Sequence, residues 1–339
     1  MKSCRALTHG TPPLHHDVAM VSTTKNILSI LSTCAIGVLG FSASHPPTPR
    51  MKSLDNYLAR IGLPSFDEIK GNGSGDVNVV THELLSQIME AQSKNIPFEN
   101  FDIVAGKTIS IEESDIEEKL VDRCRGGYCF ELNNLLRTAL EAIGYDVTPL
   151  LCRVRWGNAD DSEGPNSPLN HIVLKVKTAD KGTFIADVGF GGTNSRRPVS
   201  LDVADEPQHL PEGSFRVVPS KHAHFHVLQL QIKNEWTPLY EWREERAPFI
   251  DQVVGNWYAC SHPESFFTRS LFAFRIVVGD ERHLILNEKY IIRRGYGEEK
   301  IETVEIITEK MRLLELMDEV FGAKDFDIEG IDRYLSASE

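Results

Sequence analysis

Residues 125–134 read Arg-Gly-Gly-Tyr-Cys-Phe-Glu-Leu-Asn-Asn and lead directly into a regular pattern of apolar side chains. These side chains recur at the spacing of one buried helix face: Leu132, Leu135, Leu136, Ala139, Leu140 and Ile143. The pattern predicts a helix from about Cys129 to Ile143 that ends at Gly144. Cys129 then lies at the helix N-terminus, where free N–H groups and the helix dipole favour a thiolate over a thiol.

Cys129 has two interpretations, a nucleophile or a buried structural residue. Most lone cysteines are structural, and we interpret Cys124, Cys152 and Cys260 in that way. The two glycines before Cys129 allow a sharp turn and a close approach of the backbone to a ligand. The amide groups of this turn are also suited to stabilise an oxyanion. We therefore predict that Cys129 is a nucleophile.

A nucleophilic cysteine needs a base, and the base needs a group that orients it. His171 opens an expected strand, residues 179–182 form a turn, and Asp187 lies at the end of the return strand. The two ends of such a hairpin meet, so we expect His171 and Asp187 to lie close together. Each alone also fits a structural role, as a satisfied strand histidine or an aspartate that caps a turn. Together with Cys129, they predict a catalytic trio.

The rest of the chain shows helices first, then strands, then a mixed tail, which is typical of an α+β protein. Helices are expected at residues 54–61, with Ser53 as the N-cap and Gly62 as the stop, after Thr81, and at 115–123. A last helix is expected at 308–321, with its apolar side formed by Met311, Leu313, Leu314, Met317, Val320 and Phe321. Strands are expected at 147–154, 171–176, 184–188, 225–232, 238–242, 271–278 and 283–286.

Composition limits the functions that this chain can have. Its 339 residues suffice for two or three domains. Acidic residues outnumber basic ones, 49 to 36, which argues against nucleic acid as a general partner. The six cysteines form neither a CxxC motif nor a disulfide framework, which favours a reducing, cytoplasmic location.

Residues 1–50 differ from the remainder, because Ile27–Ala43 is a mostly apolar run of 17 residues without charge. Three interpretations stay open: a secretory signal or anchor, an organelle-targeting segment, or a leader that does not belong to the folded protein. The folded part is expected to begin near Met51, and we expect it to have no membrane contact.

Four motifs in this order resemble those of the arylamine N-acetyltransferases. They are Ile-Pro-Phe-Glu-Asn-Phe at 96–101, the active-site motif at 125–133, Asp-Val-Gly-Phe-Gly at 187–191, and the run 256–266. The resemblance covers roughly residues 54–300. It implies a cysteine-protease-like core in three parts: a helical bundle at 51–145, an antiparallel β-barrel at 146–255 and an α/β lid at 256–339.

The resemblance also implies a site. Cys129, His171 and Asp187 would form the catalytic triad. Supporting positions would be an ion pair of Arg125 with Glu99, together with Asn133. Coenzyme contacts would come from Ser167, Gly189, Phe190 and Gly191, with Phe190 lining the acceptor pocket.

The implied activity is transfer of an acyl group from acetyl-coenzyme A, or another acyl-coenzyme A, to an arylamine or hydrazine, with a role in xenobiotic detoxification. No cofactor would be tightly bound. The segment 160–170, which touches the coenzyme in relatives, is polar and loop-like here. The donor therefore stays open between acetyl, propionyl and malonyl, and so does the oligomeric state.

Two rival functions are a cysteine hydrolase of protease or transglutaminase type, and a non-catalytic binding protein on the same scaffold. An open cleft favours the hydrolase, whereas a narrow pocket that excludes water favours transfer. His222, His224 and His226 alternate and would share one strand face. We interpret them as a solvated face rather than a metal site, and the last helix as a cover for a core rather than a partner surface.

Overall fold

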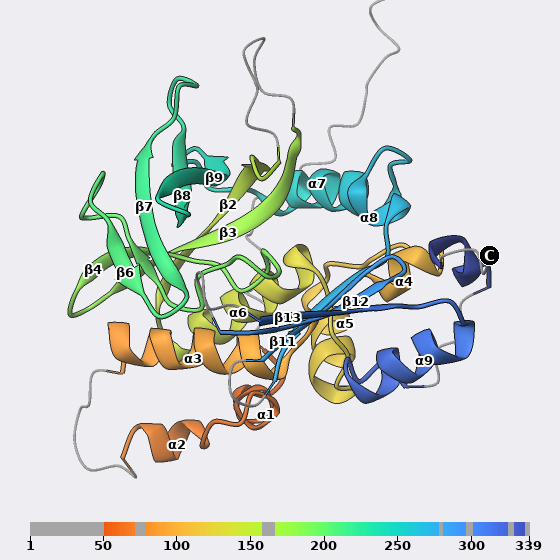
Figure 1. The fold of residues 1–339 in the computed structure, drawn as a ribbon. Helices are drawn as coiled ribbons and strands as arrows, with labels where there is room; N and C mark the ends of the chain where they lie inside the picture. Colours follow the sequence, from red (N-terminus) through yellow and green to blue (C-terminus); the bar gives the residue numbers. More distant parts are fainter. Residues whose placement is uncertain are drawn as a thin grey trace, which may run out of the picture. The chain divides into compact units, whose positions relative to one another are not determined.

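Figure 1 shows the computed structural model, which describes residues 51–71, 79–157, 167–277, 281–295, 301–324 and 329–335. All of these belong to the unit Pro49–Glu339. The predictions for residues 1–50, with the apolar run Ile27–Ala43, lie outside the described residues, and so does most of the segment 160–170.

The helical part contains α1 (Leu54–Arg60), α2 (Phe66–Ile69), α3 (His82–Asn95), α4 (Phe101–Val104), α5 (Glu113–Glu117), a π-helix (Glu118–Asp122) and α6 (Cys129–Ile143). These include the predicted helices and two short ones, α2 and α4, that were not predicted, and the helix expected at 115–123 is a short α-helix followed by a π-helix. The predicted N-cap Ser53 accepts a hydrogen bond from the Asn56 amide at 3.1 Å. Gly144 ends α6 with φ 114°, a conformation that glycine adopts without strain. The predicted bounds of α6 are thus confirmed.

Eight antiparallel strands form the central sheet, in the order β5-β4-β3-β2-β9-β8-β7-β6. They are β2 (Asp146–Val154), β3 (Leu169–Thr178), β4 (Gly182–Ala186), β5 (Val199–Ser200), β6 (Gln208–Leu210), β7 (Gly213–Pro219), β8 (His226–Ile232) and β9 (Glu235–Trp242). The two edge strands meet through one side chain, because the Gln208 amide accepts from Ser200 N at 2.7 Å and donates to Ser200 O at 2.9 Å. The sheet is therefore a nearly closed barrel.

A second antiparallel sheet has the order β1-β10-β11-β12-β13. Its strands are β1 (Phe98–Glu99), β10 (Phe272–Ile276), β11 (Arg282–Leu286), β12 (Lys289–Arg294) and β13 (Ile301–Ile306). Helix α9 (Lys310–Glu319) covers this sheet, as Figure 1 shows, and packs Leu313 and Met317 into a core with Ile285. Met311 was expected on the apolar side of this helix, and that prediction is wrong, because Met311 is 65% exposed.

Helices α7 (Phe249–Ser261) and α8 (Phe266–Arg269) connect the barrel to the second sheet. They complete an α+β architecture with segregated elements, as predicted. Two details concern the three expected domains. Residue 255, the expected end of the barrel domain, lies inside α7, and β1 comes from the helical part but pairs with β10. Within the described part of the chain, no helix is both long and apolar enough to cross a membrane.

Candidate active site

Cys129 is the first residue of α6 and is buried. The turn that precedes it is closely packed, so its two positions 126 and 127 have no room for a side chain. A Cβ on Gly126 would lie 2.5 Å from the Pro97 carbonyl oxygen, and a Cβ on Gly127 would lie 2.8 Å from Glu131 Oε2. The glycines thus leave room for the backbone at Pro97 and for the carboxylate of Glu131, whereas the sequence predicted a close approach to a ligand.

His171 and Asp187 lie together as predicted, with 2.8 Å between His171 Nε2 and Asp187 Oδ2. Both side chains are buried. His171 lies on β3 opposite Cys152 of β2, and Asp187 follows the last residue of β4. The second oxygen of Asp187 accepts from the Gly189 amide at 2.8 Å. The hairpin and the loop after it therefore fix the orientation of the carboxylate.

Asn133, one turn along α6 from Cys129, ties the helix to this hairpin. Its Nδ2 donates to Asp187 Oδ1 at 2.8 Å and to the Ile172 carbonyl at 2.7 Å, and its Oδ1 accepts from the Val188 amide at 2.9 Å. Gly189 packs directly on the helix start, where an added Cβ would meet Cys129 Cα at 2.8 Å. The same contacts hold Cys129 beside the hairpin.

The sulfur of Cys129 lies 3.9 Å from the carbonyl oxygen of Asn170, the residue before His171. Burial raises the pKa of the Cys129 thiol, and the negative charge of Asp187 raises it further. Hydrogen bonds from the amides of Phe130 and Cys129 itself act in the opposite direction. The amides of the helix start therefore act on the pKa of the thiol in the predicted direction, and burial acts against them.

Aromatic rings surround the imidazole of His171. The rings of Phe190 and Tyr240 each lie 5.2 Å from it, centroid to centroid, and 5.1 Å from one another. Phe190 was predicted as a coenzyme and acceptor contact, and here its ring packs against the imidazole. Tyr240 was not predicted, because an aromatic residue in a barrel strand is ordinarily core.

Two other predicted coenzyme contacts, Gly191 and Ser167, have these local settings. Gly191 has φ 77°, a backbone conformation that favours glycine, and the Ser167 carbonyl accepts a hydrogen bond from Arg153 at 2.7 Å.

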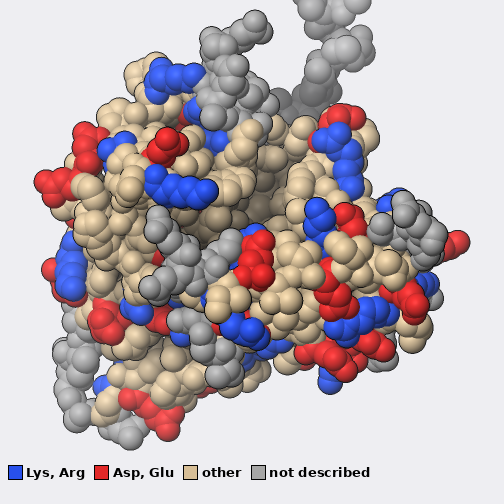
Figure 2. All heavy atoms as spheres, in the orientation of Figure 1, with Lys and Arg blue, Asp and Glu red and all other residues tan. Residues whose placement is uncertain are grey.

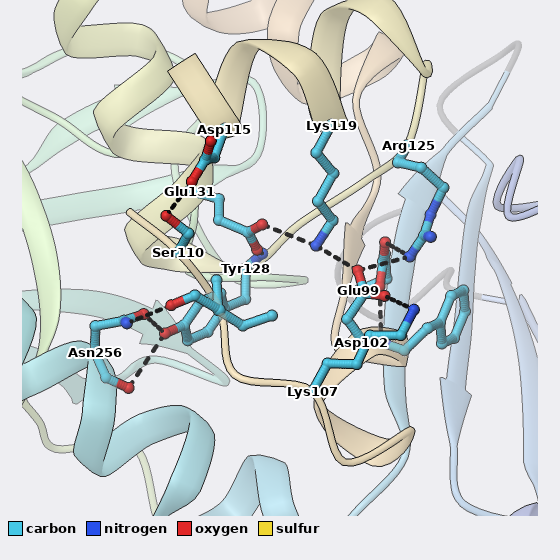
Figure 3. A network of polar contacts seen from close by, with 12 residues as sticks. Glu99, Asp102, Lys107, Ser110, Asp115, Lys119, Arg125, Tyr128, Glu131 and Asn256 are labelled. Atoms are coloured by element: carbon cyan, nitrogen blue, oxygen red, sulfur yellow. Dashed lines mark hydrogen bonds and ion pairs between the residues drawn. The ribbon is translucent and has the colours of Figure 1, made fainter. Parts of the chain in front are cut away.

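The predicted ion pair of Arg125 with Glu99 is present at 2.8 Å and belongs to a larger buried network (Figure 3). Arg125 also lies 3.2 Å from Asp102, and Lys119 contacts Asp102 at 2.9 Å and Glu131 at 2.8 Å. Asp102, Lys119 and Glu131 were not predicted from the sequence. Glu131 alone carried a signal, because it lies at the third helix position, where glutamate often caps a helix start.

Comparison with known proteins identifies the family of this chain. A sequence model of the N-acetyltransferase family matches residues 81–324. The chain is also 34% identical to an arylamine N-acetyltransferase of Mycolicibacterium smegmatis over 289 residues, which cover 84% of this chain and 97% of the relative. The chain belongs to the arylamine N-acetyltransferase family.

A solved structure agrees with this assignment. Mycobacterium marinum arylamine N-acetyltransferase in complex with CoA superposes with a TM-score of 0.70 at 29% identity, covering 83% of this chain and 97% of that one. A more distant relative, the N-malonyltransferase FDB2 of Fusarium pseudograminearum, is 26% identical over 81% of this chain and 89% of its own length. As a member of the arylamine N-acetyltransferase family, the chain is an acyltransferase, as predicted.

Two lesser predictions are wrong for this arylamine N-acetyltransferase family member. Cys124 is exposed, with φ 54°, rather than buried, although Cys152 and Cys260 are buried. The alternating histidines do not share a strand face, since β8 begins only at His226. Across the described residues, no group of three or more His, Cys, Asp or Glu side chains is placed to hold a metal.

Figure 2 shows the surface hollowed between the barrel and helix α7, with walls that are mostly neither acidic nor basic. A cavity of about 830 Å³ lies between barrel strands β6 to β8 and the second sheet. Asn194 lines this cavity and donates to the Asp187 carbonyl at 3.3 Å. One loop, residues 189–194, therefore borders both the cavity and the Cys129 site.

Proposed function

We propose that the chain transfers an acyl group from an acyl-coenzyme A to an arylamine or hydrazine through an acyl-cysteine at Cys129. One observation carries the proposal: the His171–Asp187 pair, at 2.8 Å, is held by Asn133 against the helix that begins at Cys129. A nucleophile, a base and an orienting group in this order are the requirements of covalent acyl transfer.

In the first half-reaction the thiol proton of Cys129 passes to His171. Since Nε2 of His171 hydrogen-bonds Asp187, Nδ1 is the ring nitrogen that accepts this proton. Asp187 stabilises the imidazolium, which offsets the raised pKa of the buried thiol. The sulfur then bonds to the thioester carbonyl carbon, and amides at the start of α6 stabilise the oxyanion. The bond to the coenzyme sulfur breaks, and coenzyme A leaves with the proton from His171.

In the second half-reaction the amine nitrogen attacks the acyl-cysteine. His171 accepts the amine proton as general base and returns it to the Cys129 sulfur as the amide product leaves. The two half-reactions share one site, so double-displacement kinetics are expected. Asp187 orients His171 in both.

The donor is an acyl-coenzyme A used as a co-substrate, with no tightly bound cofactor. The solved structure of a family member in complex with CoA supports this choice, and a relative named as an N-malonyltransferase keeps malonyl beside acetyl and propionyl as the acyl group. We propose Ser167, Gly189, Phe190 and Gly191 as contacts for coenzyme and acceptor. A cytoplasmic location, a detoxifying role and three domains with a lid at 256–339 belong to the same proposal.

The rival cysteine hydrolase uses the same trio, but two observations favour transfer. The relatives are transferases, and Cys129 is only 2% exposed. A buried acyl-cysteine is shielded from water until an amine arrives.

The test is intact-mass measurement after exposure to acetyl-, propionyl- and malonyl-coenzyme A. We expect a single acyl adduct that is lost when an arylamine is added. Trypsin cuts after Arg125, so the Cys129 peptide, residues 126–137, separates from Cys124. Cys129→Ala and Cys129→Ser should lose the adduct and nearly all turnover. Near-normal turnover in both variants would end the proposal.

A further inference from the structure

A buried cluster of charged side chains lies beside the start of α6, and we call it the carboxylate cluster. It holds three carboxylates, Glu99, Asp102 and Glu131, and two largely buried cations, Lys119 and Arg125. The side chains of Glu99, Glu131 and Lys119 are 0%, 3% and 9% exposed. Buried charges of this kind are costly unless each is paired, so the three carboxylates depend on the two cations to stay ionised.

The two buried cations have different places in the cluster. Arg125 contacts Glu99 at 2.8 Å and Asp102 at 3.2 Å. Lys119 reaches between Asp102 and Glu131, as Figure 3 shows, and is the cation that contacts Glu131 at 2.8 Å. Burial lowers the pKa of the Lys119 ammonium, but Glu131, Glu99 and Asp102 raise it above its ordinary value. Lys119 therefore keeps its charge over the working pH range.

Glu131 links this cluster to the nucleophile. Its Oε2 accepts a hydrogen bond from the Tyr128 amide at 3.1 Å, immediately before Cys129, and fills the space that Gly127 leaves open. The carboxylate thus caps the helix start that positions the sulfur. A negative charge at this place also opposes the formation of a thiolate two residues away.

We propose that Lys119 is a positioning residue for acyl transfer: by pairing with Glu131 it holds the cap of α6 and prevents this carboxylate from opposing ionisation of Cys129. This inference rests on the proposed function only in taking Cys129 as the nucleophile. Lys119 does not touch the reacting atoms and acts through Glu131.

The charges around Cys129 show why a neutralised Glu131 matters. Electrostatic interactions join Cys129 to Asp187 in the loop after β4, to Cys152 of β2, and to Glu131 and Tyr128 at its own helix start. Its sulfur also lies 3.9 Å from the carbonyl oxygen of Asn170, the residue before His171 on β3. Burial raises the pKa of the thiol most, then Asp187, and Glu131 adds to them. Asp187 is needed to orient His171, so the charge of Glu131 is the one that a cation can cancel without loss.

Four variants and one control test the proposal. Lys119→Met removes the cation, Lys119→Arg keeps it, Glu131→Gln removes the carboxylate, and the double variant Lys119→Met/Glu131→Gln removes both. Lys107→Met is the matched control, because Lys107 also pairs with Asp102, at 3.1 Å, but is 62% exposed. The readout is the pH midpoint for alkylation of Cys129 by iodoacetamide, followed on the tryptic peptide 126–137. Single-turnover acylation by acetyl-coenzyme A and urea unfolding are measured in parallel.

We expect Lys119→Met to raise the alkylation midpoint by about 1 pH unit and to slow acylation at neutral pH about tenfold. Glu131→Gln should lower the midpoint, the double variant should return it close to the wild-type value, and Lys119→Arg and Lys107→Met should leave it unchanged. A purely structural lysine would lower stability without moving the midpoint.

Two results overturn the proposal. One is an unchanged alkylation midpoint in folded Lys119→Met, and the other is a midpoint in the double variant that is as high as in Lys119→Met. If Lys119→Met does not fold, Glu131→Gln decides, because an unchanged or raised midpoint in that variant has the same consequence. Failure of the proposed function is seen separately, as turnover by Cys129→Ala.

Discussion

Two buried carboxylates flank the nucleophile, Asp187 on the barrel side and Glu131 on the helix side, and they differ in their partners. Each accepts a backbone amide, Asp187 from Gly189 at 2.8 Å and Glu131 from Tyr128 at 3.1 Å. Asp187 pairs with an imidazole, whereas Glu131 pairs with an ammonium group. An imidazole can both accept and donate a proton, whereas an ammonium group can only donate hydrogen bonds. The barrel side can therefore move protons, and the helix side can only hold charge in place.

The largest effect is expected from Asp187→Asn. The new side chain can still accept from Asn133 and Gly189 through its oxygen, but its NH₂ then faces His171 Nε2. That contact forces the proton onto Nδ1, the atom that must accept it from Cys129, so acylation should fall by about 10³ to 10⁴. Single-turnover acylation measures the loss, and urea unfolding checks that the fold is kept. Acylation within tenfold of wild type would show that Asp187 does not set the tautomer.

The next effect concerns stability and comes from Arg125→Met on the helix side. Glu99 is 0% exposed and lies 2.8 Å from Arg125, so the variant leaves a buried carboxylate without this cation. Loss of one partner of a buried pair should lower the free energy of unfolding by about 3 to 5 kcal/mol. The control is Arg123→Met, since Arg123 is 59% exposed and lies 3.8 Å from Glu118; it should cost less than about 1 kcal/mol. Urea unfolding measures both variants. Equal losses of unfolding free energy would show that the buried ion pair of Arg125 with Glu99 does not stabilise the fold more than an exposed pair does.

The same contrast explains what could be predicted from the sequence. Helix α6 was predicted to the residue, because its buried face is apolar at helical spacing and Gly144 ends it. Helix α7 was missed, since it buries Gly255, Asn256 and Cys260 and exposes Val254 and Trp257. Its hydrophobic pattern is nearly inverted, so periodicity gives no usable signal. Strands β1 and β5 have two residues each, which is too short for any pattern.

The residues of the site also fall into those that could be predicted from the sequence and those that could not. His171 and Asp187 were predicted to meet because a short hairpin brings them together, and chain order alone implies that contact. Lys119 meets Glu131 across a turn, and Asp102 meets Arg125 between two segments, so neither pairing can be inferred from local pattern. The effect of burial on the pKa of Cys129 could not be predicted, because burial is a property of the packed fold rather than of a helix start.

The smallest expected effect is a loss of unfolding free energy at acidic pH, caused by protonation of Asp102. Burial alone would raise the pKa of this carboxyl, but Lys119 and Arg125 outweigh it and lower the pKa to about 2. The folded pKa is therefore below that of the unfolded chain, about 3.9. Such a group stabilises the fold at pH values above the unfolded pKa, and this contribution is lost as the pH falls from about 4 to about 2.

The measurement is the difference in unfolding free energy between wild type and Asp102→Asn at several pH values. We expect roughly 2 kcal/mol at pH 6, decreasing steadily below pH 4, because protonation removes from the wild type the charge that the variant already lacks. Asp67→Asn is the control, since Asp67 is 85% exposed and should contribute less than about 1 kcal/mol at any pH. A difference that stays constant down to pH 3 would mean that Lys119 and Arg125 stabilise Asp102 by shape and hydrogen bonding rather than by charge, and the contrast between the two sides of Cys129 would lose its electrostatic basis.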